Sequence, residues 1–312
     1  MSQEFKPESL MMSHGYKPEL SEGAIKAPIF QTSTFVFKSA EEGKAFFEVA
    51  YGLREKEQDE ELGLIYSRIN NPNLEILENR LSLWDKADDT AVFESGMSAI
   101  STVLLEFLKP GELVLYSSPT YGGTDHFIQE FLPKIGVEYA VFHPENTQEE
   151  IEEIIEKTGK KDKLGLIYIE TPANPTNTII DIEMCRRIAD KYRNGDDNTY
   201  VCVDNTYMGP VWSKPLEAGA DLVVYSATKF IGGHSDLIAG AVLSNAELMT
   251  RVKTLRTFLG NMVSPHTAWL MLRSLETLKI RMEKQCENAQ KVANFLKDHD
   301  KVKKVHYLGL ID

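Results

Sequence analysis

The feature that most constrains the fold is a regular alternation of short apolar runs and helical stretches that begins near Thr90. The apolar runs are AVFES, LVLYSS, LGLIYIE, YVCVDN, DLVVYS and AGAVLS, and helical stretches such as SAISTVLLEFLK and IEMCRRIADKYR lie between them. Runs that are apolar at nearly every position are typical of strands covered by helices on both faces. The alternation therefore predicts an α/β fold with a mostly parallel central sheet covered by helices.

The regions on either side of this alternation predict a division into three parts. Residues 1–65 show weak periodicity and predict an N-terminal arm that makes an oligomer contact; the charged run LREKEQDEELG (53–63) in it predicts a solvated helix or loop. Residues 66–262 form the predicted α/β domain. Residues 263–312 predict the start of a smaller C-terminal α+β domain, with one long amphipathic helix after Pro265 and then a strand in KVKKVHYLGL (301–310). Because that strand would start a new layer, we expect this last domain to be incomplete.

Composition and charge exclude several classes of function. The 312 residues are 42% hydrophobic, which allows a large core, and they carry a formal net charge of -13. An acidic chain argues against nucleic acid as the main partner. No segment approaches the roughly 20 apolar residues that span a bilayer, and the N-terminus lacks a signal-peptide pattern. We expect a soluble cytoplasmic protein with no membrane partner.

The three cysteines argue against metal and disulfide chemistry. Cys185, Cys202 and Cys286 are far apart and show no CxxC spacing. Cys202 lies in an apolar strand and Cys286 on an apolar helical stripe, so we expect both in the core. A disulfide framework and a zinc site are therefore not predicted, and a reducing compartment fits.

Polar residues gather where the predicted strands end. Ligands of parallel sheets bind beyond the carboxyl ends of the strands, so these residues mark the expected site. Gly96 stands between a strand and a helix, where backbone N–H groups and the helix dipole favour an anion, although an ordinary glycine turn is the alternative. Ser226 and Thr228 could add hydroxyl donors. Neither GxxxxGK[ST] nor GxGxxG occurs, so the usual nucleotide-binding patterns are absent.

Three further residues complete a recognisable set. Asp204 ends the strand YVCVD and is either a turn residue or a carboxylate that holds a cationic heterocycle nitrogen. Lys229 ends the next strand, where burial would lower its pKa and allow it to form a Schiff base. Tyr121 could stack on a ring. An anion cradle, a ring face, a carboxylate and an imine-forming lysine together describe a site for pyridoxal 5'-phosphate.

At these residues the sequence resembles the Cys/Met-metabolism (trans-sulfuration) family of pyridoxal-phosphate enzymes. The resemblance runs from about Ile29 to the end, and its most specific pieces are YSRINNPN, ESGMSAI, YGGT, ETPANPTN, VDNTY, SATKFIGGHSD and SPHTAWLMLRSLETLKIRM. It implies a fold-type I, aminotransferase-like domain and a homotetramer built as a dimer of dimers with shared sites.

The resemblance implies a role for each site residue. Lys229 would carry the cofactor and then move protons, Asp204 would pair with the pyridine nitrogen, and Tyr121 would stack on the ring and take part in catalysis. The remaining cofactor-binding residues would be Gly96, Met97, Ser226 and Thr228 at the phosphate, Asn174 near the phenolic oxygen or the substrate carboxylate, and Tyr66 and Arg68 at the phosphate of the neighbouring subunit.

The implied reaction is γ-replacement or γ-elimination on a sulfur amino acid or a homoserine ester, as in cystathionine γ-synthase. The alternatives are methionine γ-lyase, cystathionine γ-lyase or O-acetylhomoserine sulfhydrylase activity, and then β-elimination or a non-catalytic member of the family. Gly123 stands where methionine γ-lyases typically carry a cysteine, which argues against that activity. We expect the C-terminal region, which in the family supplies the arginine for the substrate carboxylate, to be absent here, and the stretch AYGLREKEQDEELGLIYSR (50–68) is longer than expected before YSR.

Overall fold

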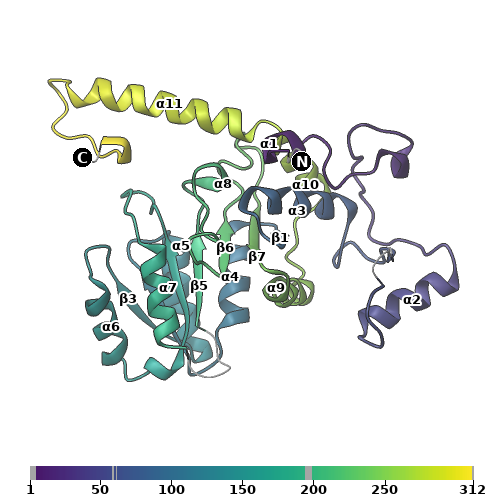
Figure 1. The fold of residues 1–312 in the computed structure, drawn as a ribbon, viewed down its shortest axis with the longest axis horizontal. Coiled ribbons are helices and arrows are strands. Elements are labelled where there is room, and N and C mark those ends of the chain that lie inside the picture. The colour runs from purple at the N-terminus through teal and green to yellow at the C-terminus, as the bar shows by residue number, and fades with distance from the viewer. Residues whose placement is uncertain (1–4, 58–59, 61, 194–198, 311–312) are drawn as a thin grey trace.

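The computed structural model describes residues 5–57, 60, 62–193 and 199–310. In this part of the chain, seven strands form one sheet in the order β1-β7-β6-β5-β4-β2-β3 (Figure 1). The strands are β1 (Asp89–Phe93), β2 (Leu113–Ser117), β3 (Glu138–Phe142), β4 (Leu164–Glu170), β5 (Tyr200–Asp204), β6 (Leu222–Tyr225) and β7 (Gly240–Ser244). The pairs from β3 to β6 are parallel, and β7 runs antiparallel to both β6 and β1. The predicted mostly parallel α/β sheet is confirmed.

Helices cover both faces of this sheet, as the continuous apolar strands predict. One face packs on α4 (Gly96–Phe107) and α9 (Ala246–Leu259). The other packs on α3 (Pro72–Asp85) and α10 (Pro265–Leu275) at one end and on α6 (Gln148–Lys157) and α7 (Ile182–Lys191) at the other. Because strand side chains alternate, β6 sends Val223 to α3 and α10 and Val224 to α4 and α9.

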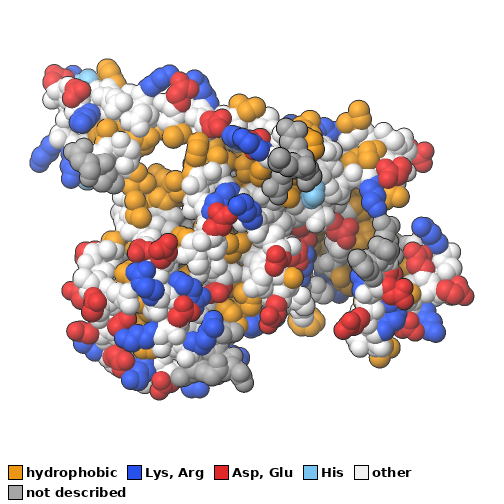
Figure 2. Space-filling model, in the orientation of Figure 1, with side chains coloured by type: hydrophobic (Ala, Val, Ile, Leu, Met, Phe, Trp, Pro, Cys, Tyr) orange, Lys and Arg blue, Asp and Glu red, His pale blue; other side chains and the backbone are white. Residues whose placement is uncertain are grey.

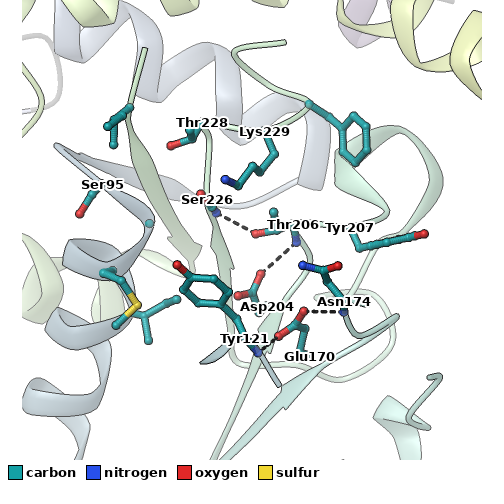
Figure 3. A pocket seen from close by; sticks show the side chains of 15 residues that line it. Ser95, Tyr121, Glu170, Asn174, Asp204, Thr206, Tyr207, Ser226, Thr228 and Lys229 are labelled. Carbon is teal, nitrogen blue, oxygen red and sulfur yellow. Dashed lines mark hydrogen bonds between the residues drawn. The ribbon is translucent and has the colours of Figure 1, made fainter. Parts of the chain in front are cut away.

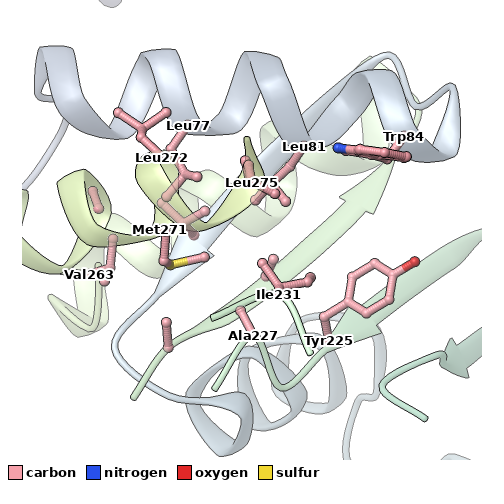
Figure 4. Close-up of a cluster of buried hydrophobic side chains, with 14 of the residues drawn as sticks. Leu77, Leu81, Trp84, Tyr225, Ala227, Ile231, Val263, Met271, Leu272 and Leu275 are labelled. Carbon is pink, nitrogen blue, oxygen red and sulfur yellow. The ribbon is translucent and has the colours of Figure 1, made fainter. Parts of the chain in front are cut away.

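The core beside α3 and α10 also holds the chain that follows β6. Figure 4 shows Leu77 and Leu81 of α3 and Leu275 of α10 packed over the segment that carries Ala227 and Ile231. These side chains are at most 2% exposed. Burial of an aliphatic side chain of this size contributes roughly 1.5–3 kcal/mol, so this core holds the residues on both sides of Lys229 firmly in place.

Local capping signals set where the site helices begin. The Ser95 hydroxyl accepts the N–H of Ser98 at the start of α4, and Asn71 caps α3 just before Pro72. The remaining helical segments are α1 (Pro7–Leu10), α2 (Ala40–Ala50), α5 (Gly122–His126), α8 (Gly209–Trp212), α11 (Leu278–Lys297), a π-helical turn (Phe127–Phe131) and short 3₁₀ turns at Pro18–Ser21, Leu132–Ile135, Lys161–Lys163 and Leu308–Leu310.

The N-terminal region extends away from the sheet domain. Figure 1 shows α2 standing apart from the sheet, and the ring of Phe37 packs on Phe46 and Phe47 of that helix. The described residues of the charged run 53–63 form a loop, in which Arg54 pairs with Glu48 and Glu60; residues 58, 59 and 61 lie outside the described part.

Three sequence predictions for the C-terminal region are wrong. The single long helix is two helices, α10 and α11, separated at residues 276–277, and the residues of 301–310 form a loop and a 3₁₀ turn in place of a strand. A strand needs a partner edge, and none adjoins this segment in the described part of the chain. Cys286 is exposed rather than in the core, because α11 projects beyond the sheet domain (Figure 1). Figure 2 shows hydrophobic side chains gathered along the side of α11 that faces the sheet.

Candidate active site

Eight of the ten predicted site residues line one pocket of about 430 Å³ at the carboxyl edge of the sheet (Figure 3). The loop after β2 supplies Tyr121 and the loop after β4 supplies Asn174, whereas Asp204 ends β5. Ser226, Thr228 and Lys229 follow β6, and Gly96 and Met97 begin α4. The parallel strand order therefore brings together residues that are far apart in the sequence.

Asp204 is a buried carboxyl group that no cation of the described residues pairs with. Its side chain is 4% exposed. It accepts the N–H of Thr206 at 3.0 Å and the hydroxyl of Tyr168 at 3.2 Å, and no ion pair to it occurs within the described residues. Burial, reinforced by the nearby negative charge of Glu170, raises the pKa of Asp204 to about 6. A cationic ring N–H would supply the missing charge and a hydrogen bond.

Glu170 is a site residue that the sequence reasoning missed. Its Oε2 accepts the N–H of Tyr121 at 2.5 Å and the hydroxyl of Thr120 at 2.9 Å, and its Oε1 accepts the N–H of Asn174 at 3.0 Å. One buried carboxylate thus joins the loop that carries Tyr121 to the loop that carries Asn174 (Figure 3). The available signal was a glutamate at the end of a completely buried apolar strand.

A second buried network lies behind the pocket. The Tyr225 hydroxyl donates to the two oxygens of Asp85 at 2.9 and 3.0 Å and accepts the Nδ2 of Asn205 at 2.8 Å. Burial raises the pKa of Asp85 to about 7, against the attraction of Lys214. Since Asn205 follows Asp204 and Tyr225 precedes the Ser226–Lys229 loop, this network couples the ends of β5 and β6.

The start of α4 is an anion cradle that only glycine permits. A β-carbon on Gly96 would lie 2.7 Å from the Ser226 β-carbon and 2.9 Å from its α-carbon, so the backbone here packs directly on the chain after β6. The first amides of a helix lack intrahelical partners and sit at the positive end of its dipole. An anion in this pocket can therefore receive backbone N–H groups at close range.

The two predicted hydroxyl donors are not equivalent. Thr228 Oγ1 already donates to the Ala239 carbonyl and accepts the Ala239 N–H, both at 3.1 Å. The Ser226 hydroxyl has no partner among the described residues, while its backbone N–H donates to the Thr206 hydroxyl at 2.8 Å. Of these two hydroxyls, that of Ser226 is therefore the one available to an anion, as far as the described residues go.

Lys229 is exposed, so the expectation that this lysine is buried is wrong. The pocket that Lys229 lines opens to solvent. The lysine's backbone is nevertheless held in place. Arg281 of α11 donates to the carbonyls of Phe230 and Ile231 at 2.8 and 3.2 Å, and it approaches there because Gly233 adopts a φ of +71° and has no side chain.

Tyr66 and Arg68 do not reach the pocket that holds Lys229. Both line a separate cavity of about 540 Å³, where Arg68 lies over the Tyr66 ring and donates to the Thr257 carbonyl. The prediction that they serve a neighbouring subunit is untested. The aromatic residues Tyr207 and Phe230, which the sequence reasoning also missed, line the main pocket beside Lys229.

These residues fit pyridoxal phosphate as a group. The cradle at Gly96 and the Ser226 hydroxyl suit a phosphate, the uncompensated Asp204 suits a cationic ring nitrogen, and the Lys229 amine can bind an aldehyde. Tyr121, 49% exposed at the pocket, offers a ring face. The described residues contain no cluster of His, Cys, Asp or Glu suited to a metal ion, and none of their helices has the length and apolarity needed to cross a bilayer.

Comparisons with known proteins agree with this chemistry. A model of the Cys/Met metabolism PLP-dependent enzyme family matches residues 8–312. L-methionine gamma-lyase of Fusobacterium nucleatum subsp. polymorphum is 38% identical over 290 residues, which are 92% of this chain and 68% of that protein. Chloroplastic cystathionine gamma-synthase 1 of Arabidopsis thaliana is 33% identical, over 92% of this chain and 47% of that protein.

The fold is also shared with a solved structure. The crystal structure of metB from Corynebacterium glutamicum superposes with a TM-score of 0.83 at 32% identity, covering all of this chain and 73% of that one. A family match over nearly the whole chain, the same fold and a pocket that suits the cofactor point to one conclusion. The chain belongs to the family of pyridoxal-phosphate-dependent enzymes of cysteine and methionine metabolism.

Proposed function

We propose that this enzyme acts at the γ-carbon of a sulfur amino acid or a homoserine ester, by replacement or elimination of the γ-substituent. The observation that carries the proposal is the single pocket that combines the Lys229 amine, the Tyr121 hydroxyl and the buried Asp204 carboxyl. Relatives named methionine gamma-lyase and cystathionine gamma-synthase support a sulfur amino acid substrate.

Each residue of the pocket has a distinct chemical role in this proposal. Bound pyridoxal phosphate supplies an electron sink that makes the substrate's α-C–H acidic. Asp204 holds the ring nitrogen protonated, which requires the carboxylate to be ionised. Lys229 Nζ, on the loop after β6, takes the α-proton and moves protons to and from the β-carbon. The Tyr121 hydroxyl binds the substrate amine through a hydrogen bond, and Asn174 orients the substrate carboxylate or the cofactor.

The geometry at Gly123 favours replacement as in cystathionine γ-synthase. A β-carbon at this position would lie 2.6 Å from Cε1 of Tyr121 and 3.1 Å from Sδ of Met97. The cysteine typical of methionine γ-lyases therefore does not fit beside Tyr121 as this ring is placed. Elimination remains the second candidate, because the relatives of 36–39% identity include six L-methionine gamma-lyases.

A product assay tests the proposal. The cofactor-loaded enzyme is offered O-acetyl- or O-succinylhomoserine with cysteine or sulfide, and then cystathionine or methionine alone. Cystathionine or homocysteine supports replacement, and 2-oxobutanoate supports elimination. The Lys229→Ala variant should form neither, whereas Lys134→Ala on the surface should behave as wild type. Pyruvate as the only product would refute action at the γ-carbon.

The setting of the enzyme is part of the proposal. Arg68 and Tyr66 line a cavity of their own, which supports their use by a neighbouring subunit within a homotetramer. The three free cysteines support a reducing cytoplasm. Light scattering tests the assembly: a monomer with full activity would contradict it.

A further inference from the structure

A second, smaller cavity lies away from the cofactor pocket, where the N-terminal arm meets α3 and α10. Its volume is about 160 Å³, and none of its lining residues lines the pocket around Lys229. The lining is made by Ile25, Lys26, Ala27, Arg80, Trp269, Leu272, Arg273 and Glu276. The proposed reaction uses none of them.

Arg80 of α3 makes this cavity unusual. Its side chain is 4% exposed, and its Nε donates to the His14 carbonyl at 2.9 Å. In the described part of the chain this is the one hydrogen bond of the guanidinium, which has five N–H groups, and no carboxylate lies within 4.0 Å of it. Buried arginines are ordinarily paired, because an uncompensated buried charge is unfavourable.

The charges of the described lining compensate Arg80 only in part, because the attraction of Glu276 acts on it without a direct ion pair. Glu276 is the one acidic residue of the lining, and it is already ion-paired with Lys26. Arg273 is exposed and pairs with no residue of the described chain. Three cations and one anion leave the cavity with an excess of two positive charges, so it favours an anionic occupant.

The apolar lining and the volume of the cavity determine what kind of anion fits. Ile25, Leu272 and the indole of Trp269 form an apolar surface, and Trp269 holds its ring in place by donating to the Ala27 carbonyl at 3.0 Å. A volume of 160 Å³ equals that of about five water molecules, which matches an organic acid of about four carbons. Guanidinium groups bind carboxylates through two parallel hydrogen bonds.

We propose that this cavity is a binding site for a compact organic monocarboxylate, with the carboxylate on Arg80 and the short apolar chain against Trp269. The occupant joins the arm at residues 25–27 to α3 and α10, so binding stabilises the packing of the arm. This site is independent of the reaction proposed above, and either assignment can fail alone.

Tryptophan fluorescence of the cofactor-loaded enzyme tests the proposal, since Trp269 lines this cavity and no tryptophan is among the described residues that line the cofactor pocket. Titration with butyrate should give a saturable change that Trp269→Phe abolishes. Arg80→Met should weaken binding at least about tenfold, because it removes a charge-assisted pair. Arg187→Met, at an exposed position on α7, is the matched control and should bind as wild type, as should Lys229→Ala.

A second set of measurements separates binding from a structural role. Without butyrate, Arg80→Met should melt at or above the wild-type temperature, since it removes a buried charge that is only partly compensated; butyrate should raise the melting temperature of wild type only. If Arg80→Met does not fold, Arg273→Ala provides the test and should weaken binding severalfold. Unchanged butyrate binding in these variants, or equal binding of uncharged butyramide or inorganic phosphate, would overturn the proposal.

Discussion

Replacing Glu170 by glutamine tests whether one buried carboxylate organises the active site. Its two oxygens accept three hydrogen bonds, from Thr120, Tyr121 and Asn174. A glutamine has one oxygen, so if it keeps the first two bonds its NH₂ group faces the N–H of Asn174. The variant then loses one charge-assisted bond and leaves a donor unpaired, at a cost of about 2–4 kcal/mol. This corresponds to a loss of about 30- to 1,000-fold.

The loss should appear in kcat/KM and in cofactor affinity, because the displaced loops carry Tyr121 and Asn174. Glu170→Gln should also change the pH dependence of cofactor binding, and this change favours binding at low pH. The negative charge of Glu170 helps to raise the pKa of Asp204, so its removal should lower that pKa. Because Asp204 must be ionised to hold the ring nitrogen, the loss of cofactor binding at acid pH (the acid limb) should then move to lower pH. Cofactor titrations between pH 5 and pH 8 measure both effects. A variant that merely loosens the fold would weaken binding without moving the limb.

The matched control is Glu150→Gln. Glu150 also accepts a backbone N–H, that of Thr147 at 3.0 Å, but at the exposed start of α6. This variant should keep wild-type kcat/KM and cofactor affinity. If Glu170→Gln also stays within about threefold of wild type and its acid limb does not move, the carboxylate does not organise the site.

Three further predictions concern stability and the cofactor. Asp85→Asn should stabilise the protein at pH 8 by up to about 4 kcal/mol. The reason is that a carboxyl group whose pKa is raised from 3.8 to about 7 on folding destabilises the fold progressively as the pH rises through that window. Urea unfolding measures the gain, which should vanish near pH 4. Gly96→Ala should weaken cofactor binding at least about tenfold in absorbance titrations, whereas Gly122→Ala, with open space around it, should not. Arg281→Met should lower kcat severalfold in steady-state assays, because the two carbonyls after the lysine lose their donor; an unchanged kcat would show that α11 does not hold that loop.

The sequence predicts the sheet and the composition of the pocket well, because both depend on local patterns. Apolar runs such as LGLIYIE identify strands, and a parallel sheet then brings their polar ends together wherever they lie in the chain. The position of Asp204 after YVCV marks it as a strand-end carboxylate, and only its combination with Gly96, Tyr121 and Lys229 pointed to a cofactor. The resemblance to a family added roles that spacing alone does not supply.

The remaining features depend on contacts that local patterns do not contain. The function of Glu170 follows from where two loops meet, and the obstruction at Gly123 follows from the position of the Tyr121 ring. The exposure of Cys286 reflects how far α11 projects, although its helical periodicity is real. The pairing of Asp85 with Tyr225 spans 140 residues and has no sequence signature.

The antiparallel insertion of β7 has a consequence for how the site assembles. β1 leads into the anion cradle of α4, and its pairing partner is β7, so the pairing of Phe93 with Gly240 helps to place the cradle against the chain after β6. Pairings over such long sequence separations form late, because a large loop must first be closed. During synthesis, we therefore expect the cofactor pocket to form only after β7 has emerged. Cofactor binding therefore indicates that all seven described strands have paired. A chain interrupted before Gly240 should fold locally without binding the cofactor.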